Sequence, residues 1–323
     1  MIRRIILVVA VVVALPAAVL FSGDRWIPWW GEGAFGEASG LSGQAAPVTM
    51  FSAPSGHRLA LRRTPPAAET FAAAVVVHGL GLHGGWYRGL AERLSEAGVL
   101  VVTVDLPGHG LSTGRRGTMP APSTLVGDLA AVAAEVSAAR PELPLLLIGH
   151  SFGAELVSRP ALVQAVTGAG VPLGGVAALA PFFSGAGVQA AFDIEQPLFS
   201  VSPRGLVSSA YPALRYNWPS GFEDPLLQST FDRSLLHLWH SALPATERLK
   251  GLSLPVLLLA GQDDAVISAD RVAALAAAVD NTLVTFRRVA GADHMSLPAH
   301  SSAALLAWAG HVVGAQTPEL ARP

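Results

Sequence analysis

The chain has 323 residues, of which 51% are hydrophobic and 14% charged, a length that can bury one large α/β core but is short for two. Its formal net charge is −2, and the 21 Lys and Arg form no basic stripe along the sequence, so nucleic acid is not expected as a partner. The absence of cysteine excludes disulfides, thiolate metal ligands and thiol nucleophiles.

Residues 1–21 are predicted to be a targeting segment. A short basic start with Arg3 and Arg4 precedes an uncharged, apolar run over residues 5–21. The run is slightly shorter than a bilayer core requires and has no clear cleavage site, so an uncleaved signal anchor, a cleaved signal peptide and a buried N-terminal helix are all open alternatives. Because positive charge favours a cytoplasmic N terminus, we expect a membrane-anchored protein that faces the extracytoplasmic side, or a secreted one if the segment is cleaved.

Residues 22–47 are predicted to be a flexible linker, and residues 48–323 to form the main domain. From Gly31 to Pro47 the sequence is rich in Gly, Ser and Ala and has little apolar surface to bury. Two short extended runs, at 48–51 and 58–63, then flank a group of turn residues, which predicts an opening hairpin.

Strand-length apolar runs alternate with helix-like stretches through the main domain. These runs cover residues 72–77, 99–104, 144–148, 175–179, 255–259 and 283–289. Such alternation is typical of a mostly parallel sheet with helices on both faces, an α/β fold class. Two helices have clear signals: residues 125–136 place their large apolar side chains on one helix face, and Ser268 can cap a helix that runs to about Val279.

Residues 181–251 interrupt this alternation and are predicted to be an inserted lid subdomain, because connections between consecutive elements are usually only a few residues long. The insertion is rich in Phe, Tyr and Trp. Most of these aromatic side chains are expected to form a small core of its own, and a minority to line an apolar pocket. Phe182 and Phe183 lie nearest the sheet edge in the sequence and are the predicted substrate-binding residues.

The strongest functional signal is Gly149-His150-Ser151-Phe152-Gly153, which directly follows the apolar run at 144–148. G-x-S-x-G between a buried strand and a helix is the signature of a nucleophile elbow, in which a strained turn lifts the serine hydroxyl clear of the sheet. Ser151 is therefore the predicted nucleophile. The two glycines are expected to make room for the turn, and His150 to pack or hydrogen-bond beneath it.

A serine nucleophile needs a histidine base and a carboxylate that orients this histidine. In such a fold the acid and the base follow later strands, and the last two apolar runs lead into Asp263-Asp264 and into Asp293-His294. His294 is the predicted base. Asp264 is preferred as the acid because it fits the pattern G-x-x-D-x-V, and Asp263 is the alternative.

The oxyanion of a tetrahedral intermediate needs two hydrogen-bond donors, one from the residue after the nucleophile and one from a loop after an earlier strand. Phe152 and Leu80 are the predicted donors. Leu80 lies in the glycine-rich run 77–85, whose glycines let the backbone approach a substrate closely but do not have the spacing of a dinucleotide site.

Together these motifs resemble the monoacylglycerol lipase and lysophospholipase branch of the α/β-hydrolases, which is also grouped with the serine aminopeptidases of type S33. The resemblance extends over about residues 48–313. It depends on the glycine-rich run with Trp86-Tyr87, on residues 105–112, on the elbow, on Asp224-Pro225-Leu226, and on the loops of the predicted acid and base. It implies an α/β-hydrolase fold with a triad of Ser151, Asp264 and His294, an oxyanion hole of Leu80 and Phe152, and a lid at 181–251.

We expect a serine hydrolase that cleaves a small lipid-like carboxylic ester, of the monoacylglycerol or lysophospholipid type, through an acyl-enzyme on Ser151. No metal or cofactor is expected, since His237 and His240 have the spacing of a metal pair but no further ligands nearby. Low charge, an aromatic insertion and a membrane-proximal N terminus favour an uncharged lipid over a peptide. Two alternatives are open: an amide or carbon–carbon bond as the target, and a non-catalytic binding protein of the same fold.

Overall fold

The computed structural model describes residues 27–30, 47–183, 199–208, 210–218, 224–240 and 244–316. The predicted targeting segment at 1–21 lies outside these residues. Within the described ranges, no helix is both long enough and apolar enough to cross a bilayer.

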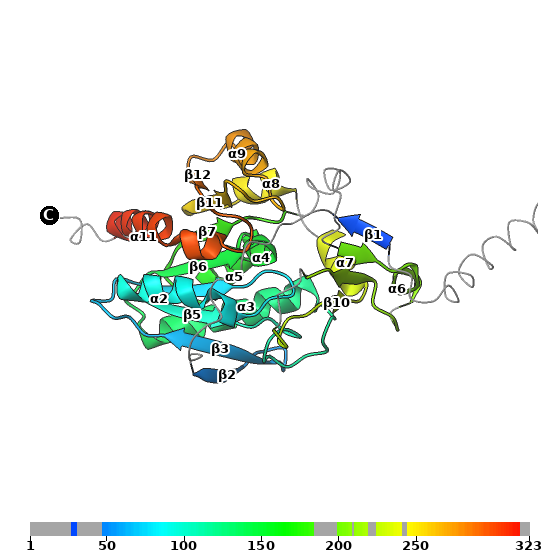
Figure 1. Ribbon diagram of the computed structural model, residues 1–323. Helices are drawn as coiled ribbons and strands as arrows, with labels where there is room; N and C mark the ends of the chain where they lie inside the picture. Colours follow the sequence, from blue (N-terminus) through cyan, green and yellow to red (C-terminus); the bar gives the residue numbers. More distant parts are fainter. Residues whose placement is uncertain are drawn as a thin grey trace, which may run out of the picture.

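A central sheet of eight strands forms the main domain (Figure 1). The strands lie in the order β12-β11-β7-β6-β4-β5-β3-β2. Their bounds are β2 Val48–Ser52, β3 Arg58–Thr64, β4 Ala72–Val77, β5 Val99–Val104, β6 Leu145–His150, β7 Leu173–Leu179, β11 Val256–Gly261 and β12 Val284–Val289. From β5 to β12 along the sheet all pairings are parallel, whereas β2 and β3 form an antiparallel hairpin at the opposite edge. The predicted strands and the predicted hairpin are therefore confirmed.

The central strands β4, β6, β7 and β11 are buried on both faces of the sheet, and successive side chains of each strand point to opposite faces. In β4, Val75 and Val77 belong to the apolar core on one side, and Ala74 and Val76 to the core on the other side. A strand that supplies two cores at once has no face left for polar side chains. This is why the central strands appear in the sequence as continuous apolar runs rather than as alternating patterns.

Helices cover the two faces in separate layers (Figure 1). On one face lie α2 (Arg88–Glu96) and α11 (Ser302–Gln316). On the other face lie α3 (Pro122–Ala139), α5 (Pro160–Gly168) and α9 (Ala269–Ala278). Helix α9 begins after Ser268 as predicted, but the Ser268 side chain makes no capping hydrogen bond, so the predicted cap is wrong.

The predicted insertion lies between β7 and β11, and in the described residues it contributes to a second, four-stranded sheet with the order β1-β8-β9-β10. Its elements are β8 Phe199–Val201, α6 Pro203–Val207, β9 Leu214–Tyr216, β10 Thr230–Phe231, α7 Ser234–His240 and α8 Ala245–Lys250. The fourth strand, β1 (Ile27–Trp30), pairs antiparallel with β8 and comes from the predicted linker. The prediction of a flexible linker is therefore wrong for these four residues, because their backbone extends the sheet of the insertion.

The insertion packs directly on the main domain. Phe183, Tyr216 and Phe231 are buried in the same apolar cluster as Val75 and Val77 of the central sheet. The prediction of a separate small core is wrong for these aromatic side chains, because the insertion is too thin to bury them without the main domain. The two parts consequently share one core on this side of the sheet.

Candidate active site

Ser151 stands between the last residue of β6 and the first residue of α4 (Phe152–Val157). Its backbone has φ 53° and ψ −114°, a strained conformation for a residue with a side chain. The turn requires its glycines: a Cβ on Gly149 would lie 2.3 Å from the carbonyl oxygen of Gly153, and a Cβ on Gly153 would lie 2.2 Å from that of Val77. The predicted strand, turn and helix around Ser151 are confirmed.

The structure brings Ser151, His294 and Asp264 into one hydrogen-bonded chain. Nδ1 of His294 donates to Oδ2 of Asp264 at 2.9 Å, which fixes the tautomer and leaves Nε2 as an acceptor. The Ser151 hydroxyl donates to this Nε2 at 3.1 Å. His294 and Asp264 are buried and Ser151 is half-buried, so the hydroxyl can meet a substrate while its partners are shielded from water.

Asp264, and not its neighbour Asp263, faces the histidine. Oδ1 of Asp264 accepts the N–H groups of Val266 and Ile267 at 2.8 and 2.7 Å, so both carboxylate oxygens have partners. Asp263 is exposed to solvent. The geometry therefore favours Asp264 as the acid that orients His294.

The loop of Leu80 lies beside Ser151. A Cβ on Gly79 would come within 3.3 Å of the Ser151 Cβ, so the Gly79 backbone passes close to the Ser151 side chain. Among the described residues, neither the N–H of Leu80 nor that of Phe152 has a hydrogen-bond acceptor, and both residues are buried. Two unpaired N–H donors next to a serine are what an oxyanion hole requires.

Tyr87 and His150 connect three loops around the site. The N–H of Gly79 donates to the Tyr87 hydroxyl at 2.9 Å, and this hydroxyl donates to Nδ1 of His150 at 2.8 Å. Nε2 of His150 then donates to the carbonyl oxygen of His294 at 2.9 Å. Burial, followed by the nearby His294, lowers the pKa of His150 well below its ordinary value, so the ring is neutral. His150 thus hydrogen-bonds beneath the elbow, as predicted.

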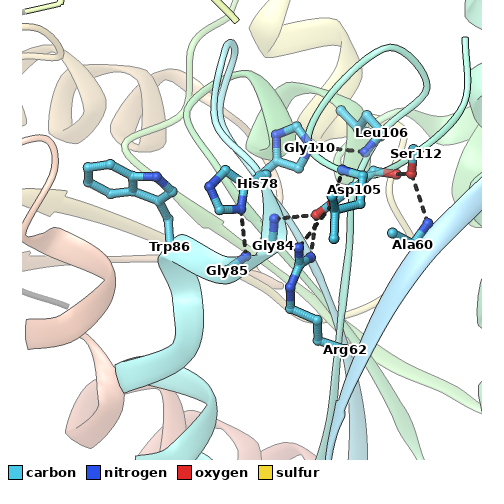
Figure 2. Close-up of polar contacts among 12 residues, drawn as sticks. Ala60, Arg62, His78, Gly84, Gly85, Trp86, Asp105, Leu106, Gly110 and Ser112 are labelled. Carbon is cyan, nitrogen blue, oxygen red and sulfur yellow. Dashed lines mark hydrogen bonds and ion pairs between the residues drawn. The ribbon is translucent and has the colours of Figure 1, made fainter. Parts of the chain in front are cut away.

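A buried carboxylate attaches the glycine-rich loop to the sheet (Figure 2). Asp105, directly after β5, accepts from Nη1 of Arg62 at 2.6 Å, from the N–H of Gly84 at 2.6 Å and from the N–H of Leu111 at 2.8 Å. Its backbone oxygen accepts the Ser112 hydroxyl at 2.6 Å. Burial acts to raise the pKa of Asp105, but Arg62, His78 and the Leu111 N–H together outweigh it, so this pKa lies below its ordinary value. The loop is therefore held by a charged, fully paired side chain.

Sequence reasoning assigned no role to Arg62, Tyr87 or Asp105. Asp105 and Tyr87 lie in segments that carry the family resemblance, and an acidic residue directly after a buried strand was a usable signal. Arg62 had no comparable signal, because it stands next to Arg63 in a hairpin strand and only the fold shows which of the two faces the core.

An apolar pocket lies near the hydrogen-bonded chain, although Ser151, His294 and Asp264 are not among its lining residues. It is lined by Pro181, Phe182, Phe183, Ala245, Val266, Ile267, Ser268, Arg271, Val272 and Leu275. The N–H of Phe182 donates to the backbone oxygen of Ser151 at 3.3 Å, and Val266 and Ile267 hydrogen-bond to Asp264. The structure therefore places Phe182 and Phe183, the two predicted substrate-binding residues, in the lining of this pocket, and the backbone of Phe182 contacts that of Ser151.

No group of three or more His, Cys, Asp or Glu side chains in the described part of the chain is arranged to hold a metal ion. His237 and His240, the pair considered from the sequence, lie on α7, and their side chains are outside the described part.

Comparison with known proteins gives a family and several relatives. Residues 68–298 match the model of the family described as serine aminopeptidase, S33. The monoacylglycerol lipase of Mycolicibacterium smegmatis is 32% identical over 107 residues, which are 33% of this chain and 38% of that protein. The monoglyceride lipase of Rattus norvegicus is 37% identical over 98 residues, which are 30% of this chain and 32% of that protein. The chain thus spans about a third of the length of these curated relatives.

A solved structure shares the fold over nearly the whole chain. The soluble variant of monoglyceride lipase from Saccharomyces cerevisiae, in complex with a substrate analog, matches with a TM-score of 0.61 at 14% identity and covers 87% of this chain and 96% of that one. The predicted α/β-hydrolase fold is therefore confirmed. Because the family match at residues 68–298 covers more than half of the sequence, the chain belongs to the serine aminopeptidase S33 family of α/β-hydrolases.

Proposed function

We propose that this chain is a serine hydrolase that cleaves small lipid-like carboxylic esters, of the monoacylglycerol or lysophospholipid type, through an acyl-enzyme on Ser151. The observation that carries the proposal is the hydrogen-bonded chain from Ser151 through His294 to Asp264, next to two unpaired backbone N–H groups. The names of the two curated relatives, both lipases of monoacylglycerols, support an ester as the bond that is cleaved.

In the first half of the reaction, Oγ of Ser151 attacks the carbonyl carbon of the ester while Nε2 of His294 takes the hydroxyl proton. The carbonyl oxygen becomes an oxyanion, to which the N–H groups of Leu80 and Phe152 donate. Asp264 stabilises the imidazolium that has formed. The bond to the alcohol oxygen then breaks, His294 returns the proton to that oxygen, and the acyl group stays on Ser151.

In the second half, water takes the place of the alcohol. Nε2 of His294 removes a proton from this water as its oxygen attacks the acyl carbon, and the same two N–H groups stabilise the second oxyanion. When the bond to Oγ breaks, His294 gives its proton to Ser151. The enzyme returns to its starting state, and a carboxylic acid leaves.

The pocket beside the nucleophile supports an acyl chain as the group that is bound. Eight of its lining residues are apolar, and one of them, Phe182, donates its backbone N–H to the backbone oxygen of Ser151. Each methylene that such a pocket removes from water contributes about 0.8 kcal/mol. An alkyl chain therefore gains binding free energy here, whereas a polar or charged side chain would lose its hydration without new partners.

The family description favours a second candidate, the amide bond next to the N terminus of a peptide. An aminopeptidase binds a protonated α-amino group, for which a carboxylate is the suitable partner. The described residues that line the pocket include no carboxylate, and their one cation, Arg271, would repel an ammonium group. The ester is therefore the better candidate, and no specific observation favours a carbon–carbon bond or a non-catalytic role.

The proposal includes a location at or beyond the membrane. The apolar run at 5–21 and the two arginines before it would anchor the chain with its main domain on the extracytoplasmic side, or direct its secretion if the segment is cleaved. An anchored enzyme would meet esters that partition into the bilayer, which agrees with a lipid-like substrate.

Labelling and turnover of the full-length chain test the proposed chemistry. A fluorophosphonate should add its phosphonyl group to the peptide that contains Ser151, and wild type should hydrolyse p-nitrophenyl butyrate. Ser151→Ala should lose the label and at least about a thousandfold in kcat while the fold survives. Turnover of Ser151→Ala near the wild-type rate would exclude Ser151 as the nucleophile. Faster cleavage of aminoacyl p-nitroanilides than of esters by wild type would favour the peptidase.

A further inference from the structure

The loop that carries Leu80, residues 78–86 and called the oxyanion loop below, has little stiffness of its own. Residues 77–85 include four glycines, and Gly81 has a φ of 78°, in the region that favours glycine. An oxyanion donor acts only at about 2.7 to 3.1 Å from the oxyanion, and a misplacement of about 1 Å can reduce the rate roughly a hundredfold. Contacts from outside the loop must therefore fix the position of the Leu80 N–H.

The main domain holds the loop before and after Leu80. The N–H of Gly79 donates to the Tyr87 hydroxyl at 2.9 Å, and the N–H of Gly84 donates to Asp105 at 2.6 Å. Between these two points lie residues 80–83, which face the insertion.

Residues 224–228 of the insertion hold this middle part. The N–H of Gln228 donates to the carbonyl oxygen of Gly81 at 2.8 Å. The approach is so close that a Cβ on Gly81 would lie 2.6 Å from the backbone oxygen of Gln228 and 2.8 Å from the ring of Trp218. The backbone of Gly81, next to Leu80, is thus in direct contact with the insertion.

Asp224 supplies the side-chain contacts of the same segment. Nε2 of His83 donates to its Oδ2 at 2.7 Å, and because the N–H of Gly85 donates to Nδ1 of that ring at 3.1 Å, the proton is on Nε2. Nε1 of Trp86 donates to the same carboxylate oxygen at 3.2 Å. The other oxygen, Oδ1, accepts the N–H of Leu226 at 2.8 Å. One carboxylate of the insertion therefore joins two side chains of the oxyanion loop.

The environment keeps this carboxylate charged. Burial acts to raise the pKa of Asp224, but the hydrogen bonds from His83 and from the Leu226 N–H outweigh it, and the pKa lies below its ordinary value. A charged acceptor makes hydrogen bonds that are shorter and about twice as strong as those between neutral groups. The contact of Asp224 with His83 is consequently the strongest polar link between the insertion and residues 80–83.

We propose that Asp224 is a positioning residue of the oxyanion hole: through His83 and Trp86 it keeps the loop in the geometry in which the N–H of Leu80 meets the oxyanion. Asp224 itself touches neither substrate nor nucleophile. The inference rests on the proposed function, since it assigns a role within the same reaction. It also means that the insertion does more than cover a pocket, because displacement of residues 224–228 would disable the oxyanion hole.

The test compares Asp224→Ala with Asp232→Ala in the full-length chain. Asp232 is a matched control, because it is another carboxylate of the insertion that binds the main domain, accepting the Thr118 hydroxyl at 2.6 Å, but it has no contact with the oxyanion loop in the described structure. Asp224→Ala should reduce kcat for p-nitrophenyl butyrate about 10- to 100-fold with KM within about twofold, because binding is kept and transition-state stabilisation is lost. The rate of labelling by a fluorophosphonate, which also builds charge on an oxygen in the hole, should fall by a similar factor.

Three further measurements separate positioning from a loss of structure. Asp224→Asn keeps an acceptor for His83 and Trp86, so its kcat should lie between those of wild type and Asp224→Ala. The double variant His83→Ala with Asp224→Ala should be no worse than the poorer single variant, because both act through one contact. Both aspartate variants should lower the unfolding temperature by similar amounts.

The two hypotheses fail in distinguishable ways. Equal kcat values for Asp224→Ala and Asp232→Ala, or additive effects in the double variant, would overturn the positioning role while Ser151 chemistry stands. A wild-type chain that neither takes up the label at Ser151 nor cleaves esters would remove the proposed function and the inference with it.

Discussion

Nε2 of His150 donates to the backbone oxygen of His294 at 2.9 Å, so the residue before Ser151 holds the loop that carries His294. The ring makes this contact as a neutral imidazole, because its Nδ1 accepts the proton of the Tyr87 hydroxyl. A second proton would put a positive charge into a buried site next to His294, and this is why the pKa of His150 lies well below its ordinary value. The site depends on a buried histidine that stays uncharged.

Buried neutral histidines should make the folded chain sensitive to acid. Burial, followed by the nearby His109, lowers the pKa of His78 to about 3, and burial lowers the pKa of His109 to about 4. In the unfolded chain these groups titrate near 6.5. Between the folded pKa values and about pH 6.5, the unfolded state binds more protons than the folded state. The free energy of unfolding is therefore highest above about pH 6.5 and decreases as the pH falls from about 6.5 toward the folded pKa values.

His109→Gln tests this dependence away from the nucleophile. Gln can keep the hydrogen bond to the carbonyl oxygen of Pro107 but does not titrate. Between about pH 6 and about pH 5, the slope of unfolding free energy against pH should be smaller in the variant by roughly 1.4 kcal/mol per pH unit. Urea unfolding at several pH values measures it. His311→Gln, at an exposed position of α11, is the control, and equal slopes in wild type and His109→Gln would contradict the prediction.

Replacing the two adjacent aspartates should have very different effects on catalysis. Asp264→Asn should reduce kcat for p-nitrophenyl butyrate by about four orders of magnitude, because an amide can stabilise the wrong tautomer of His294 and cannot balance the imidazolium. Asp263→Asn should leave kcat within about twofold, since its side chain is exposed and is not bonded to His294. Equal losses, or the reverse order, would show that the acid has been assigned to the wrong residue.

The sheet could be predicted from the sequence because a strand buried on both faces is a continuous apolar run, as residues 72–77 and 99–104 are. β1 could not be predicted in this way. Its four residues include a proline and follow an apolar segment, and the strand exists only because β8, far away in the sequence, offers an open edge. Non-local pairing of this kind leaves no local pattern.

The same difference between local patterns and non-local contacts applies to the candidate site. Ser151, Asp264 and His294 could be found because each follows a strand in a short motif, and motifs of this kind are local. The contact of Asp224 with His83 joins residues 141 positions apart, and the motif around Asp224 indicated a family but not a partner. Sequence reasoning therefore selected the three residues that the structure brings into one hydrogen-bonded chain, but not the residues that hold the glycine-rich loop beside them.

The N-terminal segment should decide where the protein is found. Full-length chain should be recovered in the membrane fraction with its N terminus intact if residues 5–21 form an anchor, and a mature protein that begins near residue 20 would instead indicate a cleaved signal peptide. Mass spectrometry of the purified protein distinguishes these two cases.

Two truncations separate the anchor from the strand that follows it. Deletion of residues 1–26 should release an active, soluble enzyme, because β1 is kept. Deletion of residues 1–30 also removes β1 from the edge of β8 and should lower the unfolding temperature relative to the shorter deletion. Recovery of the shorter deletion in the membrane fraction, or identical unfolding temperatures for both, would contradict these assignments.

Chain-length preference should depend on the two phenylalanines of the pocket wall. If the pocket holds the acyl chain, four additional methylenes should raise kcat/KM by roughly two orders of magnitude, at about 0.8 kcal/mol for each methylene buried. Phe182→Ala and Phe183→Ala should flatten this increase and reduce kcat/KM least for the acetate ester, because its short acyl group buries the least apolar surface in the pocket. The measurement is kcat/KM for p-nitrophenyl esters from acetate to dodecanoate, below the concentration at which they form micelles.

Leu206→Ala is the control for these two variants, since Leu206 is an exposed apolar residue of the insertion that does not line the pocket. It should reproduce the wild-type profile. Phe183 is buried and lies 5.3 Å from the guanidinium of Arg248, so Phe183→Ala will also cost stability, whereas half-buried Phe182 reports on the pocket with less disturbance. Because lost stability reduces the activity on all esters by the same factor, only a change in the slope of kcat/KM against chain length identifies the acyl pocket. A flat profile in wild type, or variants that lose all chain lengths equally, would remove the lipid ester as the substrate class and leave Ser151 without an assigned acyl group.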